Sequence, residues 1–278
     1  MANAPTKPTT PVKESSSASG AFATLTIPIC IVVAICIFIF ILGHPSHFKG
    51  GNPENDPNPG DLFGTIHKGG VIVPIIMSYL LMVIVFSIER FVVIGKASGT
   101  GNVDAFVRKI QSLLNAGNID GASAECDKQK GSVANVIKSG LKKYREMEAD
   151  QTMDVDQKAL AIQKDIEEAT ALEMPMLEQN LTIIATLVSI GTLTGLLGTV
   201  IGMIGAFATL GASGAPNQSE LSTHISEALI NTALGIGTSA ISIVMYNVFT
   251  SKIDKLTYAI DETGFSIVQT FAASHKNK

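Results

Sequence analysis

The sequence predicts an all-α, polytopic membrane protein whose long helices extend beyond the bilayer. Of its 278 residues 46% are hydrophobic and only 16% are charged, and the mean hydropathy is +0.33. That composition is too apolar for an ordinary soluble domain. Four nearly uncharged runs are also long enough, at about 20 residues, to cross a bilayer core of about 30 Å. The net charge of -4 gives no basic surface for nucleic acid.

The first predicted span, residues 21–42, follows a Thr/Ser/Pro-rich tail, residues 1–20, which is expected to be disordered. Its apolar run is longer than that of a secretory signal and lacks a small-residue cleavage site, so we expect an uncleaved anchor. Because only a short polar turn separates the last two spans, these two must form an antiparallel hairpin. The later spans are residues 69–89, 181–210 and 225–249, and the turn is residues 211–224.

Lysine and arginine are concentrated on one side of these spans. The connector, residues 90–180, holds twelve of the 20, whereas the loop 43–68 holds two and the turn 211–224 holds none. The positive-inside rule therefore predicts that the connector and both termini lie in the cytoplasm. The loop and the turn then lie on the opposite side of the membrane, which is the periplasm if the membrane is the bacterial inner membrane that the family resemblance described below implies.

The connector is expected to be helical. Asn102 is placed as an N-cap, and Gly117 as the stop after an amphipathic stretch. The segment "SVANVIKSGLKKYREM" repeats this amphipathic pattern. A third amphipathic stretch begins at Asp154 and continues without a clear break into the third span. We therefore predict one long helix with a bend at Pro175. The segment 250–278 is also predicted to be a helix.

The loop 43–68 is rich in Pro, Gly and Asn, so we expect it to be irregular. It contains His44 and His47, but Pro45 between them argues against a helix that presents both, and zinc needs three or four ligands. No metal or cofactor is therefore expected. The chain has no Walker loop, HExxH or GxSxG motif, so we do not expect an enzyme.

Glycines form a stripe along the third span. At about 100° per residue, they lie within about 40° of one line and make a groove that lets another helix approach closely. Thr192 and Thr199 lie about a quarter turn away. The glycines are Gly191, Gly195, Gly198, Gly202 and Gly205.

The fourth span carries a polar sector, with Glu227 at its edge. Two such hydroxyl-lined strips could face a hydrated pore, but Ser and Thr can equally bond the carbonyls of their own helix. Glu227 fits an ion path or an interfacial carboxylate, and both readings stay open. Because neither strip has a deep Asp, Lys or His, a proton path would need a titrating group from another polypeptide. The sector comprises Asn231, Thr232, Gly235, Thr238, Ser239 and Ser242.

Three stretches, in this order, resemble the MotA/TolQ/ExbB proton-channel family, most of all its ExbB branch. They are "GGVIVPIIMSYLLMVIVFSIERFVVIGKA", "IEEATALEMPMLEQNLTIIATLVSIGTLTGLLGTVIGMIGAF" and "ISEALINTALGIGTSAISIVMYNVF". The pair "GLLGTVIGMI" and "ISEAL...TALG" is the specific part, and the resemblance covers most of residues 65–270.

The resemblance implies a homopentamer around two copies of an ExbD-type partner, whose single membrane helix bears an aspartate. Proton flow would move that partner, and the motion would pass to a TonB-type protein that energises outer-membrane transport. It also implies that Thr199 and Thr232 line the pore and that Glu227 lies at the pore mouth. From their places on the two hydroxyl-lined strips, we predict that Thr192 and Ser239 belong to the same path.

Two features depart from that pattern. The chain has an extra N-terminal span, expected to pack outside the pentamer, and it has Thr192 where relatives commonly carry proline. TolQ-type, gliding-type and flagellar stators share the same hairpin, so the client stays open. A passive membrane scaffold and a self-sufficient channel are the rival functions.

Overall fold

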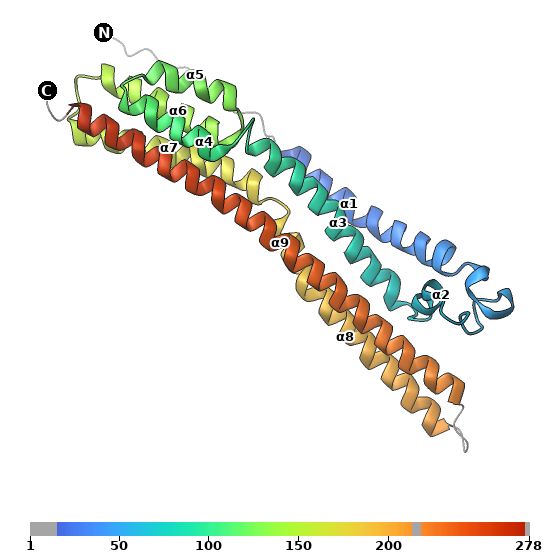
Figure 1. Ribbon diagram of the computed structural model, residues 1–278. Coiled ribbons are helices and arrows are strands. Elements are labelled where there is room, and N and C mark those ends of the chain that lie inside the picture. Colours follow the sequence, from blue (N-terminus) through green and yellow to red (C-terminus); the bar gives the residue numbers. More distant parts are fainter. Residues whose placement is uncertain (1–15, 213–217, 276–278) are drawn as a thin grey trace, which may run out of the picture.

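The computed structural model describes residues 16–212 and 218–275. Helices dominate these residues, and their one β-type pairing is an isolated bridge between Phe48 and Pro57. Within these described ranges, four helices are long and apolar enough to cross a membrane. The predicted all-α, polytopic fold is confirmed. Figure 1 shows an elongated molecule, with a helical bundle at one end and a loop and a hairpin tip toward the other. We call these the bundle end and the loop end.

The central unit is the hairpin of α8, Leu181–Ala212, and α9, Gln218–His275. The two helices lie side by side over the whole of α8 (Figure 1). Helix α9 then continues without interruption into the bundle, so the predicted fourth span and C-terminal helix are one element of 58 residues. Residues 213–217 of the predicted turn lie outside the described residues.

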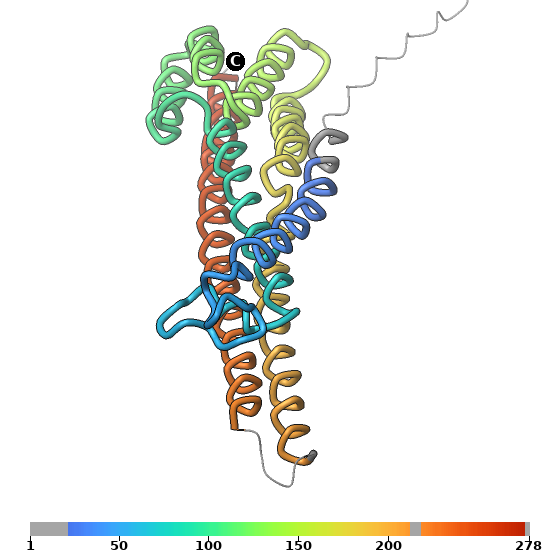
Figure 2. Tube along the Cα trace, turned by 90° about the vertical axis from the view of Figure 1, so that its right-hand side faces the viewer, coloured from blue at the N-terminus to red at the C-terminus, as the bar shows by residue number. Residues whose placement is uncertain are grey.

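Helix α3, Ile72–Ala97, packs on both α9 and α8, and α1, Ser16–Cys36, packs on α3. Figures 1 and 2 show α1 and α3 together along one side of the hairpin. Helix α1 begins at Ser16, so the last part of the tail predicted as disordered is helical, while residues 1–15 lie outside the described residues. A π-helical segment, Ile37–Leu42, completes this first span.

The bundle has four helices besides α9: three of them, α4, α6 and α7, pack against the second half of α9, and α5 packs on α4 and α6. Its core is apolar, and Ile110, Ile137 and Phe271 are fully buried there. The cap at Asn102 is confirmed, because its side chain accepts hydrogen bonds from two backbone N–H groups of the first turn. Helix α5 was not predicted, because it lacks a clear apolar stripe. The four helices are α4, Val103–Asn115; α5, Ile119–Gln129; α6, Gly131–Ala149; and α7, Val155–Glu178.

The predicted continuous helix through Pro175 is wrong. Pro175 lies within α7, and the break comes later, at Gln179 and Asn180. Asn180 has φ 61°, in the left-handed region, which asparagine tolerates better than most residues and which ends an α-helix. Helices α7 and α8 are therefore separate elements that meet at a joint.

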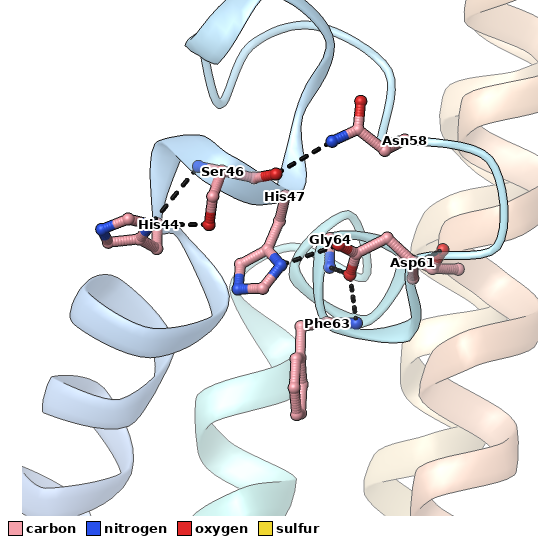
Figure 3. Close-up of polar contacts among 8 residues, drawn as sticks. His44, Ser46, His47, Asn58, Asp61, Phe63 and Gly64 are labelled. Atoms are coloured by element: carbon pink, nitrogen blue, oxygen red, sulfur yellow. Dashed lines mark hydrogen bonds and ion pairs between the residues drawn. The ribbon is translucent and has the colours of Figure 1, made fainter.

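The loop 43–68 is more ordered than predicted, and it contains the short helix α2, Leu62–His67. Asp61 caps α2, because its Oδ1 accepts hydrogen bonds from the N–H groups of Phe63 at 2.9 Å and Gly64 at 3.1 Å. Its Oδ2 lies 2.8 Å from Nδ1 of His47 (Figure 3). These hydrogen bonds keep the pKa of Asp61 below its usual value, the one with His47 contributing most. The cap explains why a Pro- and Gly-rich segment holds a fixed shape.

His44, a second of the three histidines of this loop, also has a hydrogen-bonded partner. Nδ1 of His44 lies 2.8 Å from Oγ of Ser46, and Nδ2 of Asn58 donates a hydrogen bond to the carbonyl of Ser46 at 2.9 Å (Figure 3). The two histidines thus bond to different partners, Ser46 and Asp61.

Candidate functional site on the hairpin edge

The glycine groove of α8 faces α9 of the same chain. A Cβ atom built on Gly195 would lie 3.0 Å from the carbonyl oxygen of Asn231 and 3.1 Å from Cα of Gly235, and one on Gly202 would lie 2.8 Å from Cβ of Ala228. The two backbones are therefore nearly in contact, as small residues allow. The remaining glycines meet α9 in the same way, Gly191 at Ser239, Gly198 at Asn231 and Gly205 at His224.

Close approach brings the threonines of the two helices together. The hydroxyls of Thr199 and Thr232 are hydrogen-bonded to each other, and Thr232 also donates to the carbonyl of Ala228 at 3.0 Å. Thr192 donates to Oγ of Ser239 at 2.9 Å. The three threonines are half-buried, whereas Ser239 is buried. We call these four residues the hydroxyl edge.

The hydroxyl edge lies on the side of the hairpin away from α3. Nδ2 of Asn231 donates to the carbonyl of Gly69 at 2.9 Å, so that side of α9 faces the start of α3. Thr232 is the next residue and lies about 100° further round the helix. Helices α3 and α1 therefore leave the three half-buried threonines of the hydroxyl edge uncovered, whereas Ser239 is buried.

The residues of the polar sector predicted on α9 do not form one continuous surface. Asn231, Thr238 and Ser242 are buried within the subunit, and Ser242 donates to the carbonyl of Thr238 at 2.8 Å. Only Thr232 and Ser239 of that sector pair with hydroxyls of α8. The physical reason is that α3 and α8 cover part of the sector.

Glu227 lies apart from the hydroxyl edge. Its carboxylate packs against Gly70 at the start of α3, and its Oε2 is 3.6 Å from Nδ1 of His224. Five residues separate it from Thr232, which places the two about 140° apart round α9. The structure therefore does not bring Glu227 together with the threonines of the predicted path.

Apolar side chains surround the hydroxyl edge. Leu196 is 51% exposed, Ile236 is 55% exposed and Leu229 is 65% exposed. Exposed apolar side chains on a membrane helix meet lipid or another helix. The hydroxyls are thus the polar groups of an otherwise apolar surface, where they can donate and accept hydrogen bonds without titrating near neutral pH.

Sequence reasoning missed a buried ion pair at the bundle end of the membrane helices. Arg90 is 1% exposed and pairs with Glu89 near the break between α7 and α8. The signal that could have found it is a Glu-Arg dipeptide directly at the end of an apolar span.

The chain matches the model of the MotA/TolQ/ExbB proton channel family over residues 128–262. This stretch runs from the end of α5 through most of α9, and it contains the whole hydroxyl edge.

Individual proteins are similar at modest identity. The chain is 36% identical to ExbB-like protein 3 of Synechocystis over 88 residues, which is 31% of the chain and 42% of that protein. It is 30% identical to the biopolymer transport protein ExbB of Xanthomonas campestris over 37% of the chain and 40% of that protein. The match to the Tol-Pal system protein TolQ of Pseudomonas aeruginosa is 23% identical and covers 70% of the chain and 85% of that protein.

Both ExbB matches thus span less than half of the relative's length, whereas the TolQ match spans most of it. Together with the family match, these similarities confirm the resemblance predicted from the sequence: over the matched residues the chain is similar to proteins of the MotA/TolQ/ExbB proton channel family.

Proposed function

We propose that the chain is an ExbB-like subunit of an inner-membrane motor driven by the proton-motive force. Five copies surround two copies of an ExbD-type protein, and the motion passes to a TonB-type protein that energises outer-membrane transport. The observation that carries the proposal is the hydrogen-bonded pair of Thr199 and Thr232 on the uncovered edge of the hairpin.

The hydrogen-bonded pair of Thr199 and Thr232 supports the proposal that the chain encloses a titrating group of another protein. In the spans predicted at residues 69–89, 181–210 and 225–249, the only Asp, Glu, Lys, Arg or His residues are Glu89 and Glu227, each near one end of its span and neither beside the hydroxyl edge. A proton that crosses along the hydroxyl edge therefore needs an acceptor from another chain, and a membrane aspartate of the partner supplies it. Moving one charge through 100 mV is worth about 2.3 kcal/mol, enough to bias a two-state partner.

The distribution of lysine and arginine supports the orientation. Twelve of the 20 lie in residues 90–180, which include helices α4 to α7 of the bundle. By the positive-inside rule the bundle end then faces the cytoplasm and the loop end faces the periplasm. Proton flow down its gradient would enter at the loop end.

The proposal is tested by reconstituting the chain into liposomes with the ExbD-type protein of the same organism. The Thr199→Val and Thr232→Val variants remove one hydroxyl each and keep the side-chain shape, so proton flux driven by an imposed gradient should fall while the complex still assembles. Thr186→Val is the matched control, because Thr186 is on the same helix and bonds only the carbonyl of Thr182, at 2.7 Å.

Native mass measurement of the same samples reports copy number and partner together. The proposal fails if a complex other than five to two is found, or if both variants conduct as the wild type does. Flux through the chain alone, with no partner present, would favour a self-sufficient channel instead.

Two alternatives have a specific observation behind them. A TolQ-type role is favoured by the breadth of the TolQ match, and the partner that co-purifies decides between it and the ExbB-type role. A passive scaffold is favoured because Thr199 and Thr232 already bond carbonyls of the hairpin, Gly195 at 3.3 Å and Ala228 at 3.0 Å. Unchanged function in both valine variants would support the scaffold.

A further inference from the structure

The joint between α7 and α8 leaves helix ends that need partners. Because the helix is broken at Gln179 and Asn180, the last carbonyls of α7 have no intrahelical donor and the first N–H groups of α8 have no intrahelical acceptor. The last carbonyls carry partial negative charge and the first N–H groups partial positive charge. Leu177 and Asn180 are buried, so water does not freely satisfy these groups.

A side chain from α3 caps the end of α7. Nη1 of Arg90 donates hydrogen bonds to the carbonyl of Met176 at 3.1 Å and to the carbonyl of Leu177 at 3.2 Å. These contacts join residues 86 and 87 positions apart in the sequence. A guanidinium at the negative end of a helix is the favourable arrangement of charge.

The neighbouring carboxylate completes the arrangement on the other side of the joint. Glu89 accepts two hydrogen bonds from Arg90, one of them from Nε at 2.5 Å, and its Oε2 also lies 3.4 Å from Nδ2 of Asn180. Glu89 thus places a negative charge beside the start of α8, whose first turn has no acidic residue of its own. One ion pair therefore serves two helix ends of opposite polarity.

We infer that Arg90 and Glu89 form a clasp that holds the joint between α7 and α8, and that this clasp sets the position of the hydroxyl edge relative to the bundle. Helix α9 is continuous past this level, so the joint is the point at which the α7–α8 arm of the molecule can bend. Arg90 is a positioning residue in this assignment, since it acts through the backbone of α7.

The test is hydrogen exchange, measured by mass spectrometry on the full chain in lipid nanodiscs. Arg90→Met keeps the bulk of the side chain and removes every donor, so amides of residues 171–186 should exchange about a hundredfold faster. That factor corresponds to about 3 kcal/mol, the cost of breaking a buried charge pair, at 1.4 kcal/mol per tenfold. Arg90→Lys should also open the joint, because an ammonium cannot reproduce the planar fork.

Two further variants separate the clasp from a general loss of stability. Lys96→Met removes an exposed cation from the same helix and should leave exchange unchanged. The double variant Glu89→Gln with Arg90→Met leaves no unpaired buried charge, yet the joint should still exchange fast because the carbonyls of α7 remain uncapped.

Asn180→Val tests the joint with both Arg90 and Glu89 in place: it removes the 3.4 Å contact of Asn180 with Glu89, and a β-branched residue does not tolerate φ near 61°. It should open the same stretch, and together with Arg90→Lys it decides the question if Arg90→Met does not fold. The inference is overturned if exchange in residues 171–186 stays at the wild-type rate. It is equally overturned if the double variant restores protection, or if exchange rises evenly over all helices.

Discussion

At Gly235 an added side chain would meet the backbone of the facing helix directly. A Cβ atom there would lie 2.6 Å from the carbonyl oxygen of Gly191, 2.8 Å from Cα of Gly195 and 3.1 Å from its backbone nitrogen. All three atoms belong to the backbone of α8, so no flexible side chain can move aside. Gly235→Ala therefore requires the two helices to separate.

The size of the separation follows from the contact distance. Non-bonded carbon atoms are ordinarily about 3.5–4.0 Å apart, so the 2.8 Å contact must open by about 1 Å. Overpacking of this kind costs about 1–3 kcal/mol. Both the hydrogen bond between Thr199 and Thr232 and that between Thr192 and Ser239 cross the same gap, and an added 1 Å would weaken or break them.

Gly237→Ala is the matched control. The position lies two residues further along the same helix, and an added Cβ would meet nothing within 4 Å. Both variants gain the same helix-propensity term of about 0.5–1 kcal/mol, so the difference between them isolates the contact with α8.

We expect the free energy of unfolding of Gly235→Ala to be about 1–3 kcal/mol lower than that of Gly237→Ala. The measurement is an SDS titration of the subunit dispersed as a monomer in mixed micelles, followed by circular dichroism. Equal unfolding free energies for the two variants would refute the near-contact of the two backbones and, with it, the geometry of the hydroxyl edge.

Two further predictions concern the loop and the bundle. The pKa of Asp61 is lowered mainly by its hydrogen bond with His47, so the cap contributes stability above the usual aspartate pKa and loses it as the pH falls through the lower, folded value. The protection factor of the Gly64 amide should therefore fall on acidification below about pH 4, and a protection factor independent of pH would contradict the cap. Burial raises the pKa of Cys126 to about 12, so in a background with no other cysteine this thiol should resist maleimide at pH 7.5. A cysteine in place of exposed Lys128 on the same helix should react readily, and equal labelling rates would show that Cys126 is accessible.

The membrane spans and the glycine groove could be predicted because each depends on a local pattern. Span length follows from the bilayer thickness, and the spacing of Gly195 and Gly202 places both on one line whatever surrounds the helix. The structure adds that the line faces α9. Asn102 was predictable for the same reason, since a cap acts on the turn directly after it.

The joint could not be predicted in the same way, because its cause is distant in the sequence. The residues around Asn180 continue a helical pattern on both sides, and Pro175 is the stronger local signal for a bend. Arg90, 86 positions before Met176, donates to the carbonyls that the break leaves free. A break held by a tertiary contact leaves little trace in the segment that breaks.

The polar sector of α9 shows what the angular position of a residue on a helix predicts and what it does not predict. Helical periodicity correctly groups Asn231 and Thr232 on adjacent faces, but it carries no information on which neighbour covers which face. Once α3 takes the hydrogen bond of Asn231, that side of the sector is buried in the subunit, and Thr232 is left on the uncovered side. Because Glu227 points toward α3 as well, any partner that reaches the threonines approaches a surface with no carboxylate of this chain beside them. The charge requirement of a proton path at that surface therefore falls on the partner.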